Sequence, residues 1–403
     1  MGARGRPPPP SRGWCGARLP EWGPGRIIYL DNNATTPLDP RVARVMVEEL
    51  ERGAPANPSS LHGAGRDARS RLERAREQLA GRLAVDPSEL TFTSGGTESN
   101  NLALLGVAEP EQPLFISAIE HPSVREAARR RWAAGAPGGE LPVDGEGRLD
   151  RSIRERGAEF EGALVSIQWV NNEVGTIQAL ADWAAWFHEQ GALVHTDGAQ
   201  GFFRLPDTIP ELGVDLATIT AHKSFGPTGV GALWVRRGVL LDPLLRGGPQ
   251  EKKVRAGTEN LPAIIGMGAL AALDQEALLW ADRGLAERLG RFRAELAGID
   301  GVRVLSPEGA FPTCVSIAVA DCLAETILVR LDLEGVAASS GSACSSGARE
   351  PSHVLAAMGV PDREIRGAIR LSAAPSTTEE ELSRVAGHLA RIVADLRRRP
   401  RTD

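Results

Sequence analysis

The sequence has few cysteines, no excess of basic residues and no long apolar run, and each shortage argues against a class of protein. Its four cysteines, Cys15, Cys314, Cys322 and Cys344, are too few for a disulfide framework in 403 residues. None has the CxxC spacing of a zinc or iron–sulfur site. A net charge of −6 argues against a nucleic-acid binder, and no apolar run approaches the roughly 18 residues that span a bilayer. We therefore expect a cytoplasmic protein without a metal site, a nucleic-acid partner or a membrane segment.

Residues 1–26 differ in composition from the rest of the chain. They are rich in arginine, proline and glycine, and Glu21 is their only acid. Four consecutive prolines prevent the amphipathic helix of a transit peptide, and there is no apolar core of a secretory signal. We interpret this stretch as a disordered leader, or as an over-called start of the reading frame, and expect order to begin at Ile27.

Helical and strand patterns alternate from about residue 59. We expect strands at 89–94, 113–120, 162–170, 192–197, 214–221 and 229–237, and helices at 59–84, 95–108, 123–134 and 180–190. Near-continuous apolar strands separated by helices predict an α/β fold with a mostly parallel sheet covered on both faces. Ligands of such sheets bind in the loops beyond the carboxyl ends of the strands.

The pattern changes after about residue 277, where long helices frame fewer strands. The last helix begins near Thr377 and Glu380, which stand at capping-box spacing. We expect a large domain at 41–277, and a smaller α+β domain made of 278–403 together with 27–40, which returns to it from the N-terminal side.

Two strand-end loops carry side chains suited to a flat, phosphorylated ligand. Gly95, Gly96 and Thr97 open a helix, where free N–H groups and the helix dipole favour an anion. An ordinary glycine turn with a hydroxyl cap would have the same pattern. His121 follows the next strand, and it either caps a helix or presents its ring to a flat ligand.

Three further strand ends carry amides, a carboxylate and an amine. Asn171 and Asn172 suit either a turn or hydrogen bonds to a polar ligand. Asp197 ends an apolar strand, where a carboxylate requires a cation or hydrogen-bond donors, and Gln200 follows it. Lys223 is a poor core residue, but a desolvated lysine amine readily forms a Schiff base. Together with the phosphate loop, these groups are the ones that bind pyridoxal phosphate.

The chain resembles the cysteine desulfurases, a group of class V aminotransferases within the fold-type I pyridoxal-phosphate enzymes. The resemblance runs from "YLDNNATTPLDPRV" to "RLSAAPSTTEEEL" and is carried by "FTSGGTESNN", "EH", "VNNEVG", "HTDGAQ", "AHKSFGPTGVGAL", "RAGTEN", "SSGSACSSG" and "AIRLS". It implies a large domain with a mostly parallel seven-stranded sheet, beside the smaller domain.

The resemblance also implies roles for individual residues around pyridoxal 5′-phosphate. Lys223 would bind the cofactor covalently, His121 would stack on its ring and transfer protons, Asp197 would pair with the pyridine nitrogen, and Gln200 with the phenolic oxygen. The phosphate would be held by Gly96, Thr97, Thr220 and His222. Thr258 would reach the phosphate of the other subunit, which implies a homodimer. Asn172 and Arg370 would bind the substrate carboxylate, a task that suits the guanidinium fork.

The glycine- and serine-rich stretch at about 339–350 resembles the mobile loop of the group I desulfurases, with Cys344 as the nucleophile. The resemblance implies that L-cysteine becomes L-alanine and that the sulfur stays on Cys344 as a persulfide. A flexible loop would then carry it to an acceptor protein, for iron–sulfur cluster assembly or thiolation.

Several positions depart from the usual family pattern. Ser224 and Thr228 follow the lysine where an aromatic or apolar residue and a second lysine are common, and Pro249 replaces a glycine. After Arg370, Ala374-Pro375 replaces a Gly-Arg pair, and the fixed φ of proline predicts a shifted loop near the substrate carboxylate.

Three other functions fit parts of the sequence. A selenocysteine lyase would share the cofactor site, and rates on the two substrates would distinguish the activities. Another class V aminotransferase or lyase would not require Cys344. A catalytically idle partner protein would not require the cofactor residues, all of which are present.

Overall fold

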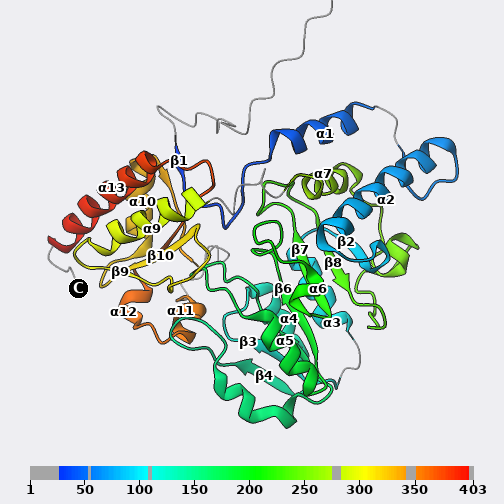
Figure 1. Cartoon of the computed structure of the whole chain (residues 1–403), viewed down its shortest axis with the longest axis horizontal. Helices are drawn as coiled ribbons and strands as arrows, with labels where there is room; N and C mark the ends of the chain where they lie inside the picture. The colour runs from blue at the N-terminus through cyan, green and yellow to red at the C-terminus, as the bar shows by residue number, and fades with distance from the viewer. Residues whose placement is uncertain (1–26, 53–55, 108–110, 275–282, 342–350, 399–403) are drawn as a thin grey trace, which may run out of the picture.

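The computed structural model describes residues 27–52, 56–107, 111–274, 283–341 and 351–398. They form two groups of elements, one around a seven-stranded sheet and one around α9, α10 and α13 (Figure 1). Residues 1–26, which we predict to be a leader, lie outside the described ranges. Within these ranges no helix is long and apolar enough to cross a membrane.

The large sheet is mostly parallel, as the sequence predicts. Five neighbouring strands run parallel to one another, and β8 is antiparallel to both of its neighbours, β7 and β2. The order across the sheet is β2 (Leu90–Thr93), β8 (Gly231–Val235), β7 (Leu216–Thr220), β6 (Leu193–Asp197), β5 (Leu164–Ser166), β3 (Leu114–Ser117) and β4 (Gly138–Leu141).

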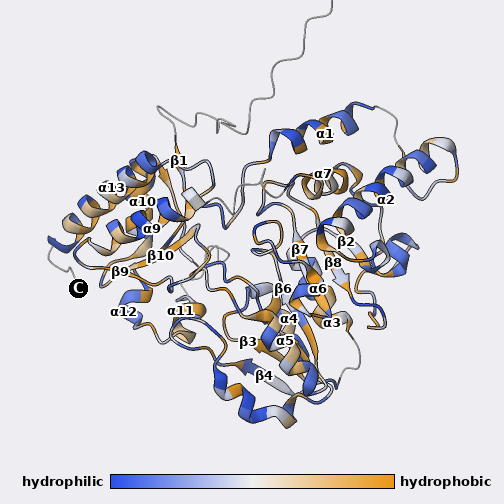
Figure 2. Cartoon of the chain, in the orientation of Figure 1, coloured by the Kyte–Doolittle hydropathy of each residue, from blue (hydrophilic) through white to orange (hydrophobic). Residues whose placement is uncertain are grey.

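Successive side chains of these strands point to opposite faces, and each face is covered by helices. Leu114 and Leu164 pack in one cluster, whereas their neighbours Phe115 and Val165 pack in another. The first cluster includes α3 (Gly96–Gly106) and α4 (Pro122–Ala133). The second includes α1 (Pro40–Glu51), α2 (Gly63–Leu83), α5 (Leu180–Glu189), α6 (Ile209–Leu212) and α7 (Leu261–Ala271). The two-sided burial explains why the central strands are largely hydrophobic. Helix α7 is also largely hydrophobic because most of its own residues are buried, whereas α1 and α2 carry both kinds of residue (Figure 2).

The edge strand β4 is absent from the strands that the sequence pattern indicated. Its residues are "GGEL", which lack the apolar run of the central strands. Gly138 has φ of +134°, and a Cβ there would clash with the carbonyl oxygen of Leu114 on the neighbouring strand. Only glycine allows the two backbones to approach this closely.

The second group of elements combines two small sheets with helices. An antiparallel sheet has the order β12 (Ala368–Ser372), β10 (Cys314–Val319), β9 (Val302–Val304), and β1 (Ile28–Tyr29) pairs in parallel with β11 (Val336–Ala337). The helices are α9 (Arg283–Ala297), α10 (Ala324–Leu333), α11 (His353–Ala357), α12 (Asp362–Ile365) and α13 (Glu379–Arg398). Ile28 and Leu30 share a buried cluster with residues of β10, α10 and α13. The exact domain boundaries stay a prediction.

The capping box of α13 lies one residue later than the sequence analysis placed it. The backbone N–H of Thr378 donates to Glu381, and the N–H of Glu381 donates to the Thr378 hydroxyl. Thr377 instead accepts a hydrogen bond from the N–H of Ala374 and closes the turn that contains Pro375. Two consecutive threonines followed by three glutamates made both registers possible in the sequence.

A buried ion pair fixes the segment that leads to Thr258. Arg76 of α2 donates to both carboxylate oxygens of Glu251, at 2.7 and 2.8 Å, and both side chains are almost fully buried. Glu251 also accepts from the N–H of Phe92 in β2, at 2.8 Å. It belongs to the 3₁₀ segment η3 (Gln250–Lys253) and has φ of +43°, a conformation that a residue other than glycine adopts only under constraint.

Removing the carboxylate should therefore destabilise the fold strongly. We expect Glu251→Ala to lower the free energy of unfolding by about 3–5 kcal/mol, because the guanidinium of Arg76 stays buried without its counter-charge. Urea denaturation followed by circular dichroism measures the loss. Glu126→Ala is the matched control, because its ion pair with Arg129 is exposed and is worth about 0–1 kcal/mol. Equal losses in the two variants would contradict the structural role of the buried pair.

Candidate active site

Four predicted site residues lie at or just beyond the carboxyl ends of the parallel strands. Asp197 is the last residue of β6 and Thr220 the last residue of β7. His121 is the N-cap residue of α4, which follows β3, and Lys223 lies three residues after Thr220. Because parallel strands end at the same edge of a sheet, these side chains from distant parts of the chain come together there.

A hydrogen-bond network joins His121 to Asp197. One amide group, Nδ2 of Asn100, donates to Asp197 Oδ2 at 2.8 Å and to Ser123 Oγ at 2.9 Å. Ser123 Oγ lies 2.8 Å from His121 Nδ1, and the Ser123 backbone N–H donates to the same nitrogen. Since a backbone N–H can only donate, Nδ1 is an acceptor, and the neutral ring therefore carries its proton on Nε2.

Burial keeps the two histidines beside Lys223 neutral. Desolvation, and next the positive charge of Lys223, lower the pKa of His121 to about 4, although the charge of Asp197 acts in the opposite direction. The same two causes lower the pKa of His222 to about 4. Near pH 7 both rings are therefore uncharged.

A narrow glycine turn lies between β2 and α3. Gly95 is the N-cap residue of α3, with φ of +150°, and it supplies no side-chain cap for the first N–H groups of the helix. A Cβ on Gly231 of β8 would lie 2.8 Å from the Cα of Gly95, so that position 231 needs glycine, whereas glycine at position 95 is favoured by its positive φ. Gly96 faces Thr220, because a Cβ at Gly96 would lie 4.0 Å from the Cβ of Thr220. Uncapped helix N–H groups at such a turn favour an anion.

Asn33 connects the predicted ligand of the cofactor ring to the substrate side of the site. Gln200 Nε2 donates to the carbonyl oxygen of Asn33 at 2.9 Å, and Asn33 Nδ2 donates to the carbonyl oxygen of Asn172 at 3.1 Å. The buried guanidinium of Arg204 donates to Gln200 Oε1 and to Asn33 Oδ1. Because a guanidinium only donates, it fixes which way the Gln200 amide faces.

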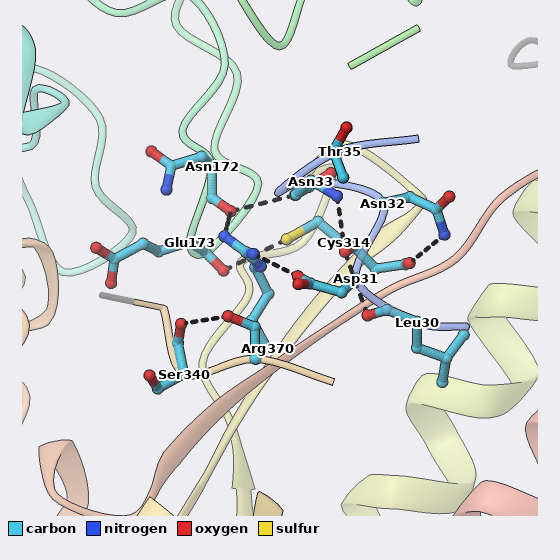
Figure 3. A network of polar contacts seen from close by, with 12 residues as sticks. Leu30, Asp31, Asn32, Asn33, Thr35, Asn172, Glu173, Cys314, Ser340 and Arg370 are labelled. Carbon is cyan, nitrogen blue, oxygen red and sulfur yellow. Dashed lines mark hydrogen bonds and ion pairs between the residues drawn. The ribbon is translucent and has the colours of Figure 1, made fainter. Parts of the chain in front are cut away.

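Arg370 lies at the centre of a second polar network (Figure 3). Its guanidinium donates to Asp31 Oδ1 at 2.7 Å and to the Asn172 carbonyl oxygen at 3.1 Å, and its side chain is 3% exposed. Backbone hydrogen bonds in both directions join Arg370 to Ser339. The structure therefore brings the Arg370 guanidinium to the backbone of Asn172, and the binding of the substrate carboxylate by the two residues stays a prediction.

The remaining predicted residues have different surroundings. Thr97 and Thr258 are exposed. His222 is partly buried and its Nδ1 lies 3.2 Å from the Thr35 hydroxyl. Cys344 lies outside the described residues, as does Cys15.

The two described cysteines are poor nucleophiles. Cys314 Sγ is buried and donates to the carbonyl oxygen of Glu173, and burial raises the pKa of the thiol to about 11. Burial also raises the pKa of Cys322. Because the thiolate is the reactive form, neither side chain suits attack on a substrate.

Asn33, Asn100, Ser123 and Arg204 have no role that is predicted from the sequence. Asn33 and Asn100 belong to motifs that carried the family resemblance, "YLDNNATTPLDPRV" and "FTSGGTESNN". In both motifs a run of polar residues directly follows a strand, and this pattern could have indicated that Asn33 and Asn100 belong to the site. Ser123 and Arg204 stand on helical or turn segments, where serine and arginine are common and carry no comparable signal.

The low pKa of His121 can be measured directly. In the unfolded chain a histidine has a pKa near 6.5, so that between about pH 4 and 6.5 the unfolded chain binds a proton that the folded site does not. The contribution of His121 to the free energy of unfolding should therefore fall as the pH decreases through this window. NMR titration of the ligand-free protein, assigned with His121→Asn, should give a midpoint near 4 for this ring. A midpoint near 6.5 would contradict the buried, neutral imidazole.

Comparisons with known proteins agree with the fold and the arrangement of the site. The family model described as aminotransferase class-V matches residues 28–385. Cysteine desulfurase IscS of Dictyoglomus turgidum is 40% identical over 382 residues, which cover 92% of this chain and 96% of the relative. A solved structure of a NifS-like protein overlaps with a TM-score of 0.83 at 34% identity, covering 92% of this chain and 100% of the other.

A second solved structure, described as SspA in complex with cysteine, overlaps with a TM-score of 0.75 at 29% identity, covering 87% of this chain and 100% of the other. These similarities confirm the predicted α/β architecture of the fold-type I enzymes. The chain therefore belongs to the class V aminotransferase family and, within it, to the cysteine desulfurases.

Proposed function

We propose that this enzyme takes the sulfur of L-cysteine, releases L-alanine and holds the sulfur as a persulfide on Cys344. The observation that carries the proposal is the meeting of His121, Asp197 and Lys223 at one edge of the sheet, where Lys223 lies close enough to lower the pKa of His121. The curated relatives named cysteine desulfurase and the cysteine complex of a structural neighbour support the same substrate.

The residues of the sheet edge fit pyridoxal phosphate. Thr220 Oγ1 is buried and has no hydrogen-bond partner among the described residues. A phosphate oxygen of the cofactor would accept a hydrogen bond from this hydroxyl. The uncapped helix start at Gly95 and Gly96 adds N–H donors for the same anion. When bound, the cofactor supplies an electron sink for the carbon atoms of the substrate.

Three side chains would hold and tune the cofactor ring. Asp197 is 3% exposed and would keep a proton on the pyridine nitrogen, with Asn100 holding one of its carboxylate oxygens. His121, whose Nδ1 is fixed by Ser123, would lie against the ring. Gln200 would donate to the phenolic oxygen, and Arg204 keeps its amide group turned for this task.

Lys223 would bind the cofactor and later move a proton at Cα of the substrate. The lysine is partly buried at the edge of the sheet, and its charge acts on His121 and His222. Around the phosphate, Thr97, Thr220 and His222 would complete the binding site, and the neutral ring of His222 can donate a hydrogen bond there.

Arg370 and Asn172 would bind the carboxylate of L-cysteine. Nε of Arg370 is buried and has no hydrogen-bond partner among the described residues, which leaves one donor for an incoming acceptor. The ion pair with Asp31 holds the guanidinium in place and offsets its charge while no substrate is bound. A substrate carboxylate would gain charge-assisted hydrogen bonds at this position.

The proposed sulfur transfer is balanced without a further reagent. Cys344, as thiolate, attacks the sulfur of the substrate, and an S–S bond forms while the C–S bond breaks. The carbon atom keeps the electron pair and takes up a proton, so that L-alanine leaves as the reduced product and the sulfur is oxidised. Cys314 and Cys322 cannot replace Cys344, because the pKa of each thiol is raised by burial.

We further propose a cytoplasmic homodimer that passes the sulfur to an acceptor protein. Glu259 supports the second subunit: it is 7% exposed, and neither of its carboxylate oxygens has a hydrogen-bond partner among the described residues of one chain. A buried carboxylate needs donors, and its neighbour Thr258 is the residue expected to reach the partner's phosphate. The low cysteine content supports a reducing compartment.

The nucleophile can be tested with Cys344→Ser. We expect the purified enzyme, given L-cysteine and a thiol reductant, to release alanine and sulfide, and mass spectrometry without reductant to find one added sulfur atom on Cys344. Cys344→Ser should lose sulfide release by at least 10³-fold, because the hydroxyl is not an equivalent nucleophile, and should keep the visible spectrum of the bound cofactor.

Cys314→Ser and Cys322→Ser are the matched controls, and both should keep the activity. Native sulfide release by Cys344→Ser would contradict the assignment of the nucleophile. The same assay with L-selenocysteine distinguishes a selenocysteine lyase, which would act much faster on that substrate.

A further inference from the structure

The neighbouring asparagines Asn171 and Asn172, in the segment that follows β5, have different surroundings. Asn171 is 1% exposed, and its Oδ1 accepts hydrogen bonds from the backbone N–H groups of Glu173 and Val174, at 2.9 and 3.0 Å. Asn172 is partly exposed. The amide of Asn171 therefore closes the turn, and the amide of Asn172 is the one that a ligand can reach.

The turn determines which way the Asn171 amide faces. Because backbone N–H groups only donate, the Asn171 atom that meets them is the oxygen, and Nδ2 lies on the other side of the amide. This Nδ2 donates to the carbonyl oxygen of Ile119 at 3.1 Å and to Gln168 Oε1 at 3.0 Å. The oxygen of the Gln168 amide therefore faces Asn171, and its Nε2 faces away from it.

Gln168 passes this orientation on to Asn172. Its Nε2 donates to Asn172 Oδ1 at 3.3 Å. With Oδ1 directed at Gln168, Nδ2 of Asn172 faces the other way, and it makes no hydrogen bond within the described parts of the chain. A carboxylate can only accept hydrogen bonds, so that this orientation of the Asn172 amide is the one that suits the carboxylate of the proposed substrate.

The backbones of Gln168 and Asn172 are also held in place. The N–H of Gln168 donates to the buried Glu120 Oε1 at 2.5 Å. The carbonyl oxygen of Asn172 accepts from Arg370 and from Asn33, both at 3.1 Å (Figure 3). The direction of its side-chain amide is therefore the freedom that Asn172 retains, and the hydrogen bond from Gln168 sets this direction.

A glutamine at such a buried position needs an explanation. Gln168 is 3% exposed, and burying an amide costs free energy unless its donors and acceptors are paired. A methionine of similar size and shape would avoid this cost. Both polar atoms of the Gln168 amide contact asparagine side chains, which indicates that the residue serves to connect Asn171 with Asn172.

We propose that Gln168 is a positioning residue, which turns the amide of Asn172 so that its Nδ2 is presented to the carboxylate of the substrate. This inference rests on the proposed function, in which Asn172 and Arg370 bind that carboxylate. Gln168 acts only through Asn172. Its loss should weaken the binding of ligands that carry a carboxylate and should leave the chemical steps nearly unchanged.

The test compares the binding of two amines to the cofactor-loaded enzyme, L-alanine and ethylamine, which is L-alanine without its carboxylate. The absorbance change of the cofactor during titration gives the affinity. Gln168→Met removes the donor to Asn172, whereas Asn171 keeps its hydrogen bonds to Ile119, Glu173 and Val174.

Gln168→Met should bind L-alanine about 3-fold to 10-fold more weakly, because only the fraction of molecules with Nδ2 turned to the ligand binds it well. Ethylamine should bind with native affinity. The KM for L-cysteine should rise by the same factor, while kcat should stay within about 2-fold of its native value, as expected when a binding interaction alone is lost.

Two further variants control for the replacement. Gln178 is also 3% exposed, and its amide bonds to the backbone of Gly147 and Leu149 instead of to site residues, so that Gln178→Met should keep native affinity for both amines. In a chain that carries Asn172→Ala, Gln168→Met should cause no further loss of L-alanine affinity, because no amide is left to orient.

Three outcomes would overturn the proposal. Native L-alanine affinity in Gln168→Met, when Asn172→Ala binds it more weakly, would show that the Asn172 amide does not need Gln168. Equal losses for L-alanine and ethylamine would show a general disturbance of the site, and additive losses in the double variant would show that the two residues act separately. Native L-alanine affinity in Asn172→Ala would instead remove the role of Asn172 in the proposed function, and the role of Gln168 with it, so that the two failures are distinguishable.

Discussion

The guanidinium of Arg370 connects the parts of the chain on which the site depends. It belongs to β12 of the second group of elements, pairs with Asp31 next to β1, and donates to the carbonyl oxygen of Asn172 beyond the seven-stranded sheet. A buried guanidinium must keep its partners, because an uncompensated buried charge costs several kcal/mol. The requirement fixes three distant segments against one another, and the substrate side of the site is built where they meet.

The cofactor side depends on a different constraint, the shared edge of parallel strands. His121, Asp197, Thr220 and Lys223 come from four positions along the chain, and they meet because their strands end together. Asn33 then links the two sides, since it contacts both Gln200 and Asn172. The geometry thus brings together the residues that we propose to hold the ring, to anchor the cofactor and to bind the substrate carboxylate.

The sequence allowed the main sheet to be predicted because its strands leave strong local patterns, and the candidate site residues were found in the loops that follow these strands. The central strands are continuous apolar runs, and each is followed by the polar residues of a loop. The edge strand β4 was not predicted from the sequence. Its Gly138 is required by the close approach of the backbone of Leu114, and such a contact between distant residues has no sequence pattern. The N-cap residue of α13 was placed one residue too early, because Thr377 and Thr378 are equally suitable as cap residues in the sequence.

Contacts between distant residues were the other features that no local pattern could reveal. The positioning of Gln200 by Arg204, the link from Asn100 to both Asp197 and Ser123, and the contact of Glu173 with Ser352 join residues whose neighbours in sequence give no hint of the partner. Glu173 stands in "VNNEVG", where an acid beside two asparagines is typical of an exposed turn. Its burial follows only from the packing of segments that are far apart in the chain.

We propose above all that this sheet edge presents Lys223 to an aldehyde cofactor. The most direct measurement is borohydride reduction of the protein loaded with pyridoxal phosphate, followed by peptide mapping of the fixed cofactor. The sequence has only three lysines, Lys223, Lys252 and Lys253, so that the map is unambiguous. We expect the cofactor on Lys223 alone. A label on Lys252 or Lys253, or an unlabelled Lys223 in protein that has retained the cofactor, would contradict it.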